Sequence, residues 1–313
     1  MNSVQEINVD KAEEFWDILS PTKPMFPEPY NLIYRGQRDA GWPLEPSVFR
    51  EHNNPIIEFN SKIPTAYQQI SSELDSFRKF LEYCDKIGIP LPGDSHQFRE
   101  IHFNSSRMLN NYLHNAYLWP HPDLYELMAI AQHYGLPTKL LDWSKYSYVA
   151  IYFAASDAID NINKITSPGN FDELKKKRLA VWILNIENKI HFPALEIVRV
   201  PSGYNKNIAN QEGCFTLLRQ SAEVNKPFNG SRFHDEFPRM LPDNYIKKVT
   251  VPVMEAVKLL ELCESHFISA STLFRDFQGA ARAVKDDLNK SKFLQLMKPD
   301  ANMVNKILMP QEA

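Results

Sequence analysis

The feature that most constrains the fold of this chain is a bent polar segment between two apolar helical stretches. Residues 132–144 contain a Gln, a His, an Asp, a Trp and a Ser around a Gly/Pro turn. The apolar residues of Leu124–Ala131 precede this segment, and those of Val149–Ala154 follow it. A buried polar group costs free energy unless it finds a partner, so such a segment is expensive to keep between buried helices. Its composition therefore predicts a functional site.

Two other segments have the same character, Tyr34-Arg35-Gly36-Gln37 and Asn210–Phe215. Arg35 lies at the end of a predicted buried strand, where its guanidinium would present a fixed fork of donors suited to phosphate or carboxylate. The adjacent glycine would let a ligand approach the backbone. The alternative is an arginine that pairs with a structural carboxylate.

Composition bounds the class of protein. The chain has 313 residues, of which 43% are hydrophobic and 23% charged, as in soluble globular proteins with a full core. A net charge of −3 gives no global attraction to nucleic acid. Cys84, Cys214 and Cys263 are few and widely spaced, which argues against disulfides and fits a reducing cytoplasm. We see no signal-peptide layout and no apolar run of roughly 20 residues, so we expect a cytoplasmic protein without membrane spans.

Periodicity predicts the elements. Apolar residues at helical spacing predict helices at residues 10–19, 66–87, 98–118, 124–133, 147–161, 253–263 and 271–288. Short apolar runs predict strands at residues 31–36, 179–184, 195–200 and 214–218, with an edge strand at 245–253. Helices come first and strands follow, which favours one α+β domain over residues 1–313. Its core would span about residues 30–284 and a helical insertion about residues 66–131.

Each polar residue of the central segment has two interpretations. His133 could serve in acid–base chemistry or in ligand binding, or it could offset a helix dipole beside Gly135. Asp142 and Ser144 could belong to a site or cap the following helix. Trp143 could stack on a planar ligand or fill the core.

Metal and hydrolase motifs give little support. His96, His102, His114 and His121 lack a carboxylate or cysteine partner at ligand spacing, so we predict no metal site. No HExxH, P-loop, GxGxxG or G-x-S-x-G pattern occurs.

The polar segments, in their order, resemble the FRG domain family. The matching residues are Tyr34-Arg35-Gly36, Trp42-Pro43-Leu44, Pro46-Ser47, Gln132 to Ser144, Ala150 to Ala154, Gln211, Gly213, Phe215 and Leu273-Phe274. Lys139 stands where the family usually has Arg, and Ser144 stands where it usually has Thr. The resemblance runs from about Tyr30 to Val284.

A second resemblance is to ADP-ribosyltransferases of the Arg-Ser-Glu type. These enzymes carry an aromatic-Arg-Gly strand end, a Ser-Thr-Ser-like strand, a helix rich in Ala and Phe, a buried strand and a last strand with the catalytic Glu. The corresponding segments here are residues 34–36, 142–144, 149–154, 179–184 and 211–215. The resemblance implies an ADP-ribosyltransferase-like split β-sheet core with a large helical insertion and C-terminal helices. It also implies NAD as the substrate.

The transferase resemblance assigns roles to named residues. Arg35 would bind the NAD diphosphate or the nicotinamide ribose, Ser144 would support the nicotinamide end, and His133 or Gln132 would orient the ribose or the acceptor. The implied NAD-binding residues are Tyr34, Arg35, Gly36, Gln37, Gln132, His133, Trp143 and Ser144. The implied catalytic residues are Arg35, His133, Ser144, Gln211 and Glu212.

The catalytic acid departs from the transferase pattern. Its expected position falls on Gln211, which is neutral, and the adjacent Glu212 would point to the opposite face of a strand. Either Glu212 lies on a bulge, or another acid serves, or the protein binds nucleotide without transfer.

Three functions follow from these observations. The first is an NAD-dependent ADP-ribosyltransferase-like protein, a bacterial effector or phage-defence toxin with a nucleotide ligand and a macromolecular acceptor. The second is a non-catalytic nucleotide-binding or protein-interaction module. The third is a hydrolase or nuclease that uses His133 and Asp142. We expect Arg35, His133, Asp142, Ser144 and Gln211 to line one cleft. We also expect Asp142 to be substantially buried and to accept hydrogen bonds from backbone amides, from Arg35 or from Lys139.

Overall fold

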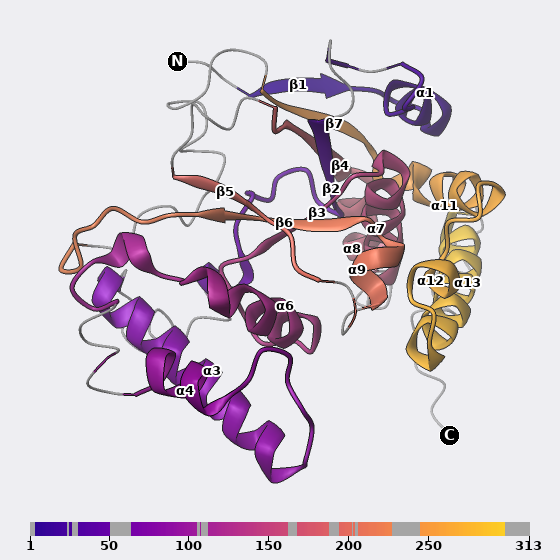
Figure 1. Ribbon diagram of the computed structural model, residues 1–313. Coiled ribbons are helices and arrows are strands. Elements are labelled where there is room, and N and C mark those ends of the chain that lie inside the picture. The colour runs from indigo at the N-terminus through magenta and orange to yellow at the C-terminus, as the bar shows by residue number, and fades with distance from the viewer. Residues whose placement is uncertain are drawn as a thin grey trace.

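Seven strands form one mixed sheet in the described part of the chain (Figure 1). The computed structural model describes residues 4–23, 25–26, 31–50, 64–104, 107, 112–161, 168–187, 194–201, 203, 206–226 and 245–297. The strands are β1 (Gln5–Asn8), β2 (Leu32–Gln37), β3 (Leu141–Ser144), β4 (Arg178–Asn185), β5 (Leu195–Val198), β6 (Gly213–Leu218) and β7 (Ile246–Pro252). Their order in the sheet is β1-β7-β4-β2-β3-β6-β5. The pair β1–β7 is parallel, and the other neighbouring strands are antiparallel.

The sheet divides between β2 and β3. These strands share a single register pair, Tyr34 with Ser144, whereas β2 pairs with β4 along its whole length from Leu32 to Gln37. One half of the sheet is therefore β1-β7-β4-β2 and the other is β3-β6-β5. The division leaves backbone groups of β2 and β3 without the continuous ladder that a closed sheet would supply.

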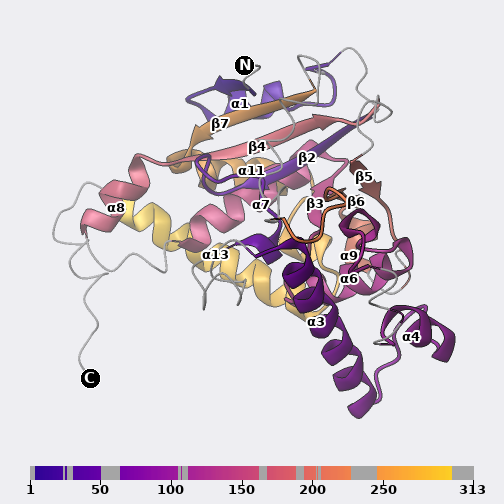
Figure 2. The ribbon, with the colours of Figure 1, turned by 90° about the vertical axis from the view of Figure 1, so that its left-hand side faces the viewer.

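Helices cover the two halves separately. They are α1 (Ala12–Ile18), α3 (Ala66–Lys86), α4 (His96–His102), α6 (Tyr125–His133), α7 (Ser147–Asp160), α8 (Pro168–Lys175), α9 (Lys206–Asn210), α11 (Ala256–Ser265), α12 (Ala270–Leu273) and α13 (Phe277–Met297). Short 3₁₀ turns lie at Ser47–Phe49, Ala116–Leu118, Pro122–Leu124 and Val253–Glu255. Helices α7 and α11 lie against the β7-β4-β2 half, and α13 packs on these helices, whereas α3 projects away from this half (Figure 2). The α3 and α6 helices share a core with β5 and β6. The architecture is α+β.

Helix α7 packs directly on β2 because Gly36 has no side chain. A Cβ at this position would lie 1.9 Å from the Ala150 carbonyl oxygen and 2.8 Å from the Ala154 nitrogen. Gly36 also lines a pocket, so the expectation that it lets a ligand approach stays a prediction, and the structure adds a packing reason for the glycine. The glycine makes room first for the backbone of α7, and this contact fixes the helix relative to Arg35.

The helical insertion buries an ion pair. Glu73 of α3 and Lys139, just before β3, are nearly inaccessible to water, and their charged groups lie 3.9 Å apart. Glu73 also accepts hydrogen bonds from Gln69 at 2.7 Å and from the Trp119 indole at 2.8 Å. Burial lowers the pKa of Lys139 to about 8, although the nearby Glu73 opposes this shift. The pair ties the insertion to the segment that leads into β3.

Most predicted elements are confirmed, and three are wrong. The helix expected at residues 98–118 ends at His102, and Asn115 caps a separate 3₁₀ turn at Ala116–Leu118. Strand β7 is not an edge strand, because β1, which the sequence did not predict, pairs along its outer side. The helix expected at residues 271–288 is two helices, and the Asp276 carboxylate accepts the Gly279 N–H at 2.7 Å in the first turn of the second. The described helices include none long and apolar enough to cross a bilayer.

Candidate functional site

A cavity of about 320 Å³ opens where the sheet divides. Its lining includes twelve residues from the predicted segments: Tyr34, Arg35, Gly36, Gln132, His133, Asp142, Trp143, Ser144, Gln211, Gly213, Cys214 and Phe215. The wall is completed by Ala129, Ala150, Phe153, Asp157, Ile208 and Phe274. The predicted convergence of Arg35, His133, Asp142, Ser144 and Gln211 on one cleft is observed. Of the residues assigned to the site from sequence, Gln37 and Glu212 are not part of this lining.

Arg35 bridges the two halves of the sheet. Its Nη1 donates a hydrogen bond of 2.8 Å to the Asp142 carbonyl oxygen and lies 3.5 Å from the Asp142 carboxylate. Burial lowers the pKa of Arg35, and the nearby Asp142 carboxylate opposes the shift. Among the described residues, Nε of Arg35 has no hydrogen-bond partner. Arg35 therefore places a cation in the pocket wall, and its Nε is a buried donor.

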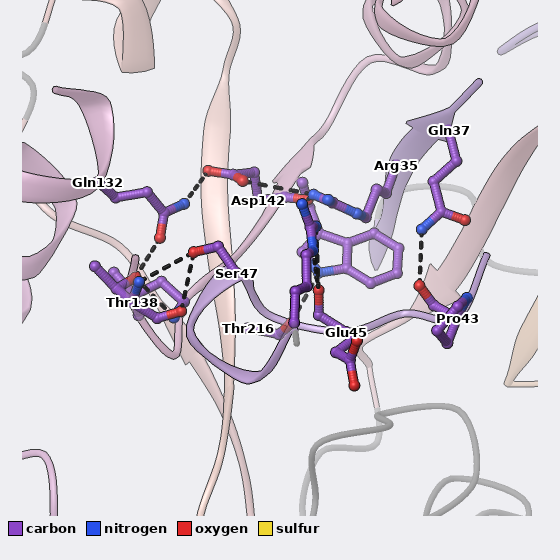
Figure 3. Close-up of polar contacts among 12 residues, drawn as sticks. Arg35, Gln37, Pro43, Glu45, Ser47, Gln132, Thr138, Asp142 and Thr216 are labelled. Carbon is purple, nitrogen blue, oxygen red and sulfur yellow. Dashed lines mark hydrogen bonds and ion pairs between the residues drawn. The ribbon is translucent and has the colours of Figure 1, made fainter. Parts of the chain in front are cut away.

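A chain of polar contacts holds Asp142 in place (Figure 3). The Gln132 side-chain amide donates to Asp142 at 2.6 Å and accepts from the Thr138 hydroxyl. The Thr138 backbone N–H in turn donates to the Ser47 hydroxyl at 3.0 Å. This network connects Ser47, through Thr138 and Gln132, to Asp142. Asp142 in turn contacts Arg35.

The Asp142 carboxylate is not buried, contrary to expectation. The side chain is 61% exposed, compared with 14% for Arg35. Asp142 lies on β3 between buried Leu141 and Trp143, and side chains alternate along a strand, so it faces the opening of the pocket. Its predicted partner Arg35 is confirmed, but the expected cost of a buried ion pair does not apply.

Ser144 anchors the turn before β6. Its hydroxyl donates to the Gln211 carbonyl oxygen at 2.8 Å and accepts the Tyr146 N–H at 2.9 Å. Gln211 and Glu212 form this turn and do not belong to a strand; Glu212 adopts a left-handed backbone conformation with φ 45°. The Glu212 carboxylate pairs with Lys145 at 3.0 Å. Glu212 therefore neither follows strand alternation nor joins the pocket lining.

Two residues that the transferase resemblance assigns to NAD binding make hydrogen bonds that support the structure around the pocket. Trp143 is 3% exposed, and its indole N–H donates to the Thr216 hydroxyl at 2.8 Å, so it fills the core beneath the pocket. Gln37 is buried, donates to the Pro43 carbonyl oxygen at 3.1 Å, and accepts from the Trp182 indole at 2.7 Å. The alternation that points Gln37 away from α7 was visible in sequence, but its partners were not.

Asp157 is a pocket residue that the sequence analysis missed. Ala150, Phe153 and Asp157 recur at helical spacing along α7, and all three line the pocket. Arg282 of α13 donates to the Asp157 carboxylate at 3.2 Å. Burial raises the pKa of Asp157, while Arg282 opposes the shift. The side chain is 53% exposed, so we interpret it as a carboxylate that meets water on the pocket side and is enclosed by protein on the others.

His133 lies at the C-terminal end of α6 and lines the pocket from the insertion side. The helix ends there as predicted, because Gly135 takes a positive φ of 94°. The two Asp142 carboxylate oxygens face Gln132 and Arg35. Each carboxylate oxygen has two lone pairs, so Asp142 can accept a further hydrogen bond in addition to these contacts.

A comparison with known protein families finds a match in the N-terminal part of the chain. Residues 30–162 match the family model described as the FRG domain. The chain therefore carries an FRG domain, and the pocket residues on β2, α6, β3 and α7 all lie within it. The pocket residues on α9 and β6, together with Phe274, lie outside the matched range. Searches of curated proteins and of solved structures found no match.

Proposed function

We propose that the protein binds NAD in this pocket and acts as an ADP-ribosyltransferase-like enzyme. The observation that carries the proposal is the combination of Arg35, Asp142 and Asp157 in one pocket at the division of the sheet. A fixed guanidinium recognises an anionic phosphate, and a carboxylate stabilises the positive charge that develops on a ribosyl centre. The divided sheet also agrees with the split core of the transferases that the sequence resembles.

The size and lining of the pocket favour one end of the dinucleotide. A volume of about 320 Å³ is at the lower end of the range for ligand pockets, so it suits the nicotinamide ribose better than a whole NAD molecule. Tyr34, Phe153 and Phe274 offer aromatic surface to a planar nicotinamide ring. Burial raises the pKa of Tyr34 to about 12, so its phenol stays neutral beside the ligand. The diphosphate would lie toward Arg35.

Asp157 takes the place of the acid that is absent at Gln211. In the proposed step the bond between C1′ of the ribose and the nicotinamide nitrogen breaks, and nicotinamide leaves with the electron pair. The acceptor nucleophile forms the new bond to C1′ and gives its proton to the Asp157 carboxylate. A pKa raised by burial suits a general base, because a base works best when its pKa is near the working pH. With water as the nucleophile, the products are ADP-ribose and nicotinamide.

The remaining pocket residues position these groups. Ser144 fixes the turn that carries Gln211, and Gln132 orients Asp142. His133 lies at the mouth, where it would contact the ribose or the acceptor. A macromolecular acceptor, a cytoplasmic location and a role as a bacterial effector or phage-defence toxin belong to the same proposal and rest on the transferase resemblance.

Nicotinamide release from NAD tests the proposal. We expect the wild-type protein to release nicotinamide, and the Arg35→Gln and Asp157→Asn variants to lose this activity. Asp160→Asn is the matched control, because Asp160 lies on the same helix and pairs with Lys285 but is not part of the pocket lining. NAD binding without nicotinamide release, with any acceptor supplied, would favour the non-catalytic nucleotide-binding module instead.

A further inference from the structure

Two histidines and an aspartate converge in the helical insertion, outside the pocket. His102 is the last residue of α4, and His121 and Asp123 lie at the 3₁₀ turn just before α6. One potential ligand atom from each residue lies within 4.8 Å of the other two. His102 is fully buried, whereas His121 and Asp123 are about half exposed, so solvent reaches the group from one side.

The spacing of the ligand atoms suits a small divalent cation. A tetrahedral zinc ion with bonds of about 2.0–2.1 Å holds neighbouring ligand atoms about 3.3 Å apart. The His102 Nε2 to Asp123 Oδ2 distance is 3.1 Å, and the His121 Nδ1 to Asp123 Oδ2 distance is 3.4 Å. Two of the three edges of the group therefore have the length that a tetrahedral site requires.

Each of the two histidines makes a hydrogen bond through its Nδ1 atom. The Nδ1 of His102 is hydrogen-bonded to the buried hydroxyl of Tyr112. Histidine ligands usually donate their second ring N–H to such a partner, which fixes the ring and leaves Nε2 free to bind. The single lone pair of His121 Nδ1 accepts the Asp123 N–H at 3.3 Å, a long hydrogen bond that a bound ion would replace. We name Tyr112 as the supporting residue of the site.

We propose that His102, His121 and Asp123 form a zinc site, with water in the fourth position. Imidazole and carboxylate are common zinc ligands, and a three-residue set with one open position is a known zinc arrangement. The sequence analysis predicted no metal here because it found no carboxylate partner near these histidines. The partner is Asp123, two residues after His121, and the fold brings His102 to both.

The position of the site suggests what the ion does. It would join the end of α4 to the turn that leads into α6, two points 19 residues apart in the sequence from His102 to His121. Helix α6 then runs to Gln132 and His133 at the pocket. A bound ion would therefore stabilise the insertion and fix the start of the helix that carries these two residues. This proposal does not depend on the reaction in the pocket.

Zinc binding to the full chain tests the proposal. We would strip the protein with a chelator, add ZnCl₂, and measure stoichiometry by elemental analysis and affinity by calorimetry against a competing chelator. We expect one zinc ion per chain and a higher melting temperature with zinc. His121→Gln and Asp123→Asn should each lower the affinity by about tenfold or more and remove the thermal gain, and Tyr112→Phe should lower it by about tenfold. Both ligand variants change half-exposed side chains, so we expect them to fold.

Two control variants distinguish this site from other histidines. His96→Gln changes an exposed histidine at the start of α4, and His133→Gln changes the histidine of the pocket. Both should bind zinc as the wild type does. Cobalt substitution adds a spectroscopic readout, because a tetrahedral site gives intense visible absorption that the ligand variants should lose. Wild-type protein that binds no stoichiometric zinc, or ligand variants that bind it equally well, would overturn the proposal and leave a hydrogen-bonded cluster.

Discussion

The guanidinium of Arg35 lies 2.8 Å from the backbone carbonyl oxygen of Asp142 and joins β2 to β3 where these strands share one register pair. The arginine thus supplies a hydrogen bond across the division of the sheet and also lines the pocket that the division creates. This double role connects the Arg35-Gly36 segment to the segment of residues 140–143 across the division of the sheet. Gly36 lets α7 pack closely on β2, and Arg35 donates a hydrogen bond to β3.

Replacement of Asp142 should cost little stability. The carboxylate is 61% exposed, and exposed ion pairs contribute about 0–1 kcal/mol. We expect Asp142→Asn to lower the free energy of unfolding by no more than about 1 kcal/mol and to weaken NAD binding. Urea denaturation and calorimetry would measure the two effects. A loss of about 3 kcal/mol or more would mean that the carboxylate behaves as one member of a buried pair.

Gly36→Ala should destabilise the fold strongly. The added Cβ would meet the Ala150 carbonyl oxygen at 1.9 Å, and backbone cannot rotate away as a side chain can. We expect a loss of about 3 kcal/mol or more, the upper end of the usual range for overpacked cores. Gly203→Ala is the matched control, because a Cβ there has nothing within 4 Å. Equal stability of the two variants in urea would contradict the packing described for α7 on β2.

Lys139 predicts a pH dependence of stability. Burial lowers its pKa in the folded protein from 10.5 to about 8. Between these pH values the unfolded chain keeps the proton that the folded chain releases, so the unfolded state binds more protons and the free energy of unfolding rises with pH. The full gain is about 3 kcal/mol by pH 10.5. Below pH 8 both states are charged, and the cost of the buried cation is constant.

Comparison with Lys139→Met isolates this effect from other groups that titrate in alkali. At neutral pH the variant removes the cost of the buried cation but also leaves Glu73 without its cation, so the two effects on stability oppose each other. Its stability should lack the rise that Lys139 contributes above pH 8. Urea midpoints at pH 7.5 and 9.5 give the measurement. Parallel pH curves for the two proteins would show that Lys139 is not desolvated.

Much of the fold and part of the site could be predicted from the sequence. Buried strands such as Leu179–Leu184 and the amphipathic helix at Ala66–Ile87 follow from periodicity, and the Gly-Pro turn marks the end of α6 at His133. Local patterns do not show which strands become neighbours, so the pairing of β1 along the outer side of β7 was missed. The four residues of β1 carry only one apolar side chain, Ile7, which is too weak a signal.

The errors in the site have identifiable physical causes. Asp142 was expected to be buried because its neighbours are apolar, but strand alternation turns it toward solvent. Glu212 was judged as a strand residue, whereas its left-handed backbone belongs to a turn. Asp157 was overlooked because an acid on an apolar helix usually faces water, and only the position of β2 and α13 shows that it faces a pocket. Local backbone conformation decides the first two, and long-range packing decides the third.

Asp157→Asn should separate chemistry from stability. The side chain is 53% exposed at the pocket, so its replacement should change the melting temperature little. We expect nicotinamide release to fall by about 10²-fold or more, the usual contribution of acid–base catalysis, with NAD binding retained. Asp160→Asn should retain activity. Full activity of Asp157→Asn would show that Asp157 is not the general base and would leave Asp142 and Glu212 as the candidates.

The central claim is that Arg35 anchors an NAD molecule in the pocket at the division of the sheet. The most direct measurement is an NAD titration of wild-type protein and Arg35→Gln by calorimetry, with nicotinamide quantified in the same samples and circular dichroism used to confirm that both proteins are folded. We predict that the wild type binds NAD at one site per chain and releases nicotinamide, while a folded Arg35→Gln does neither. Wild-type protein that neither binds nor consumes NAD, or a folded Arg35→Gln that binds it with unchanged affinity, would contradict the account.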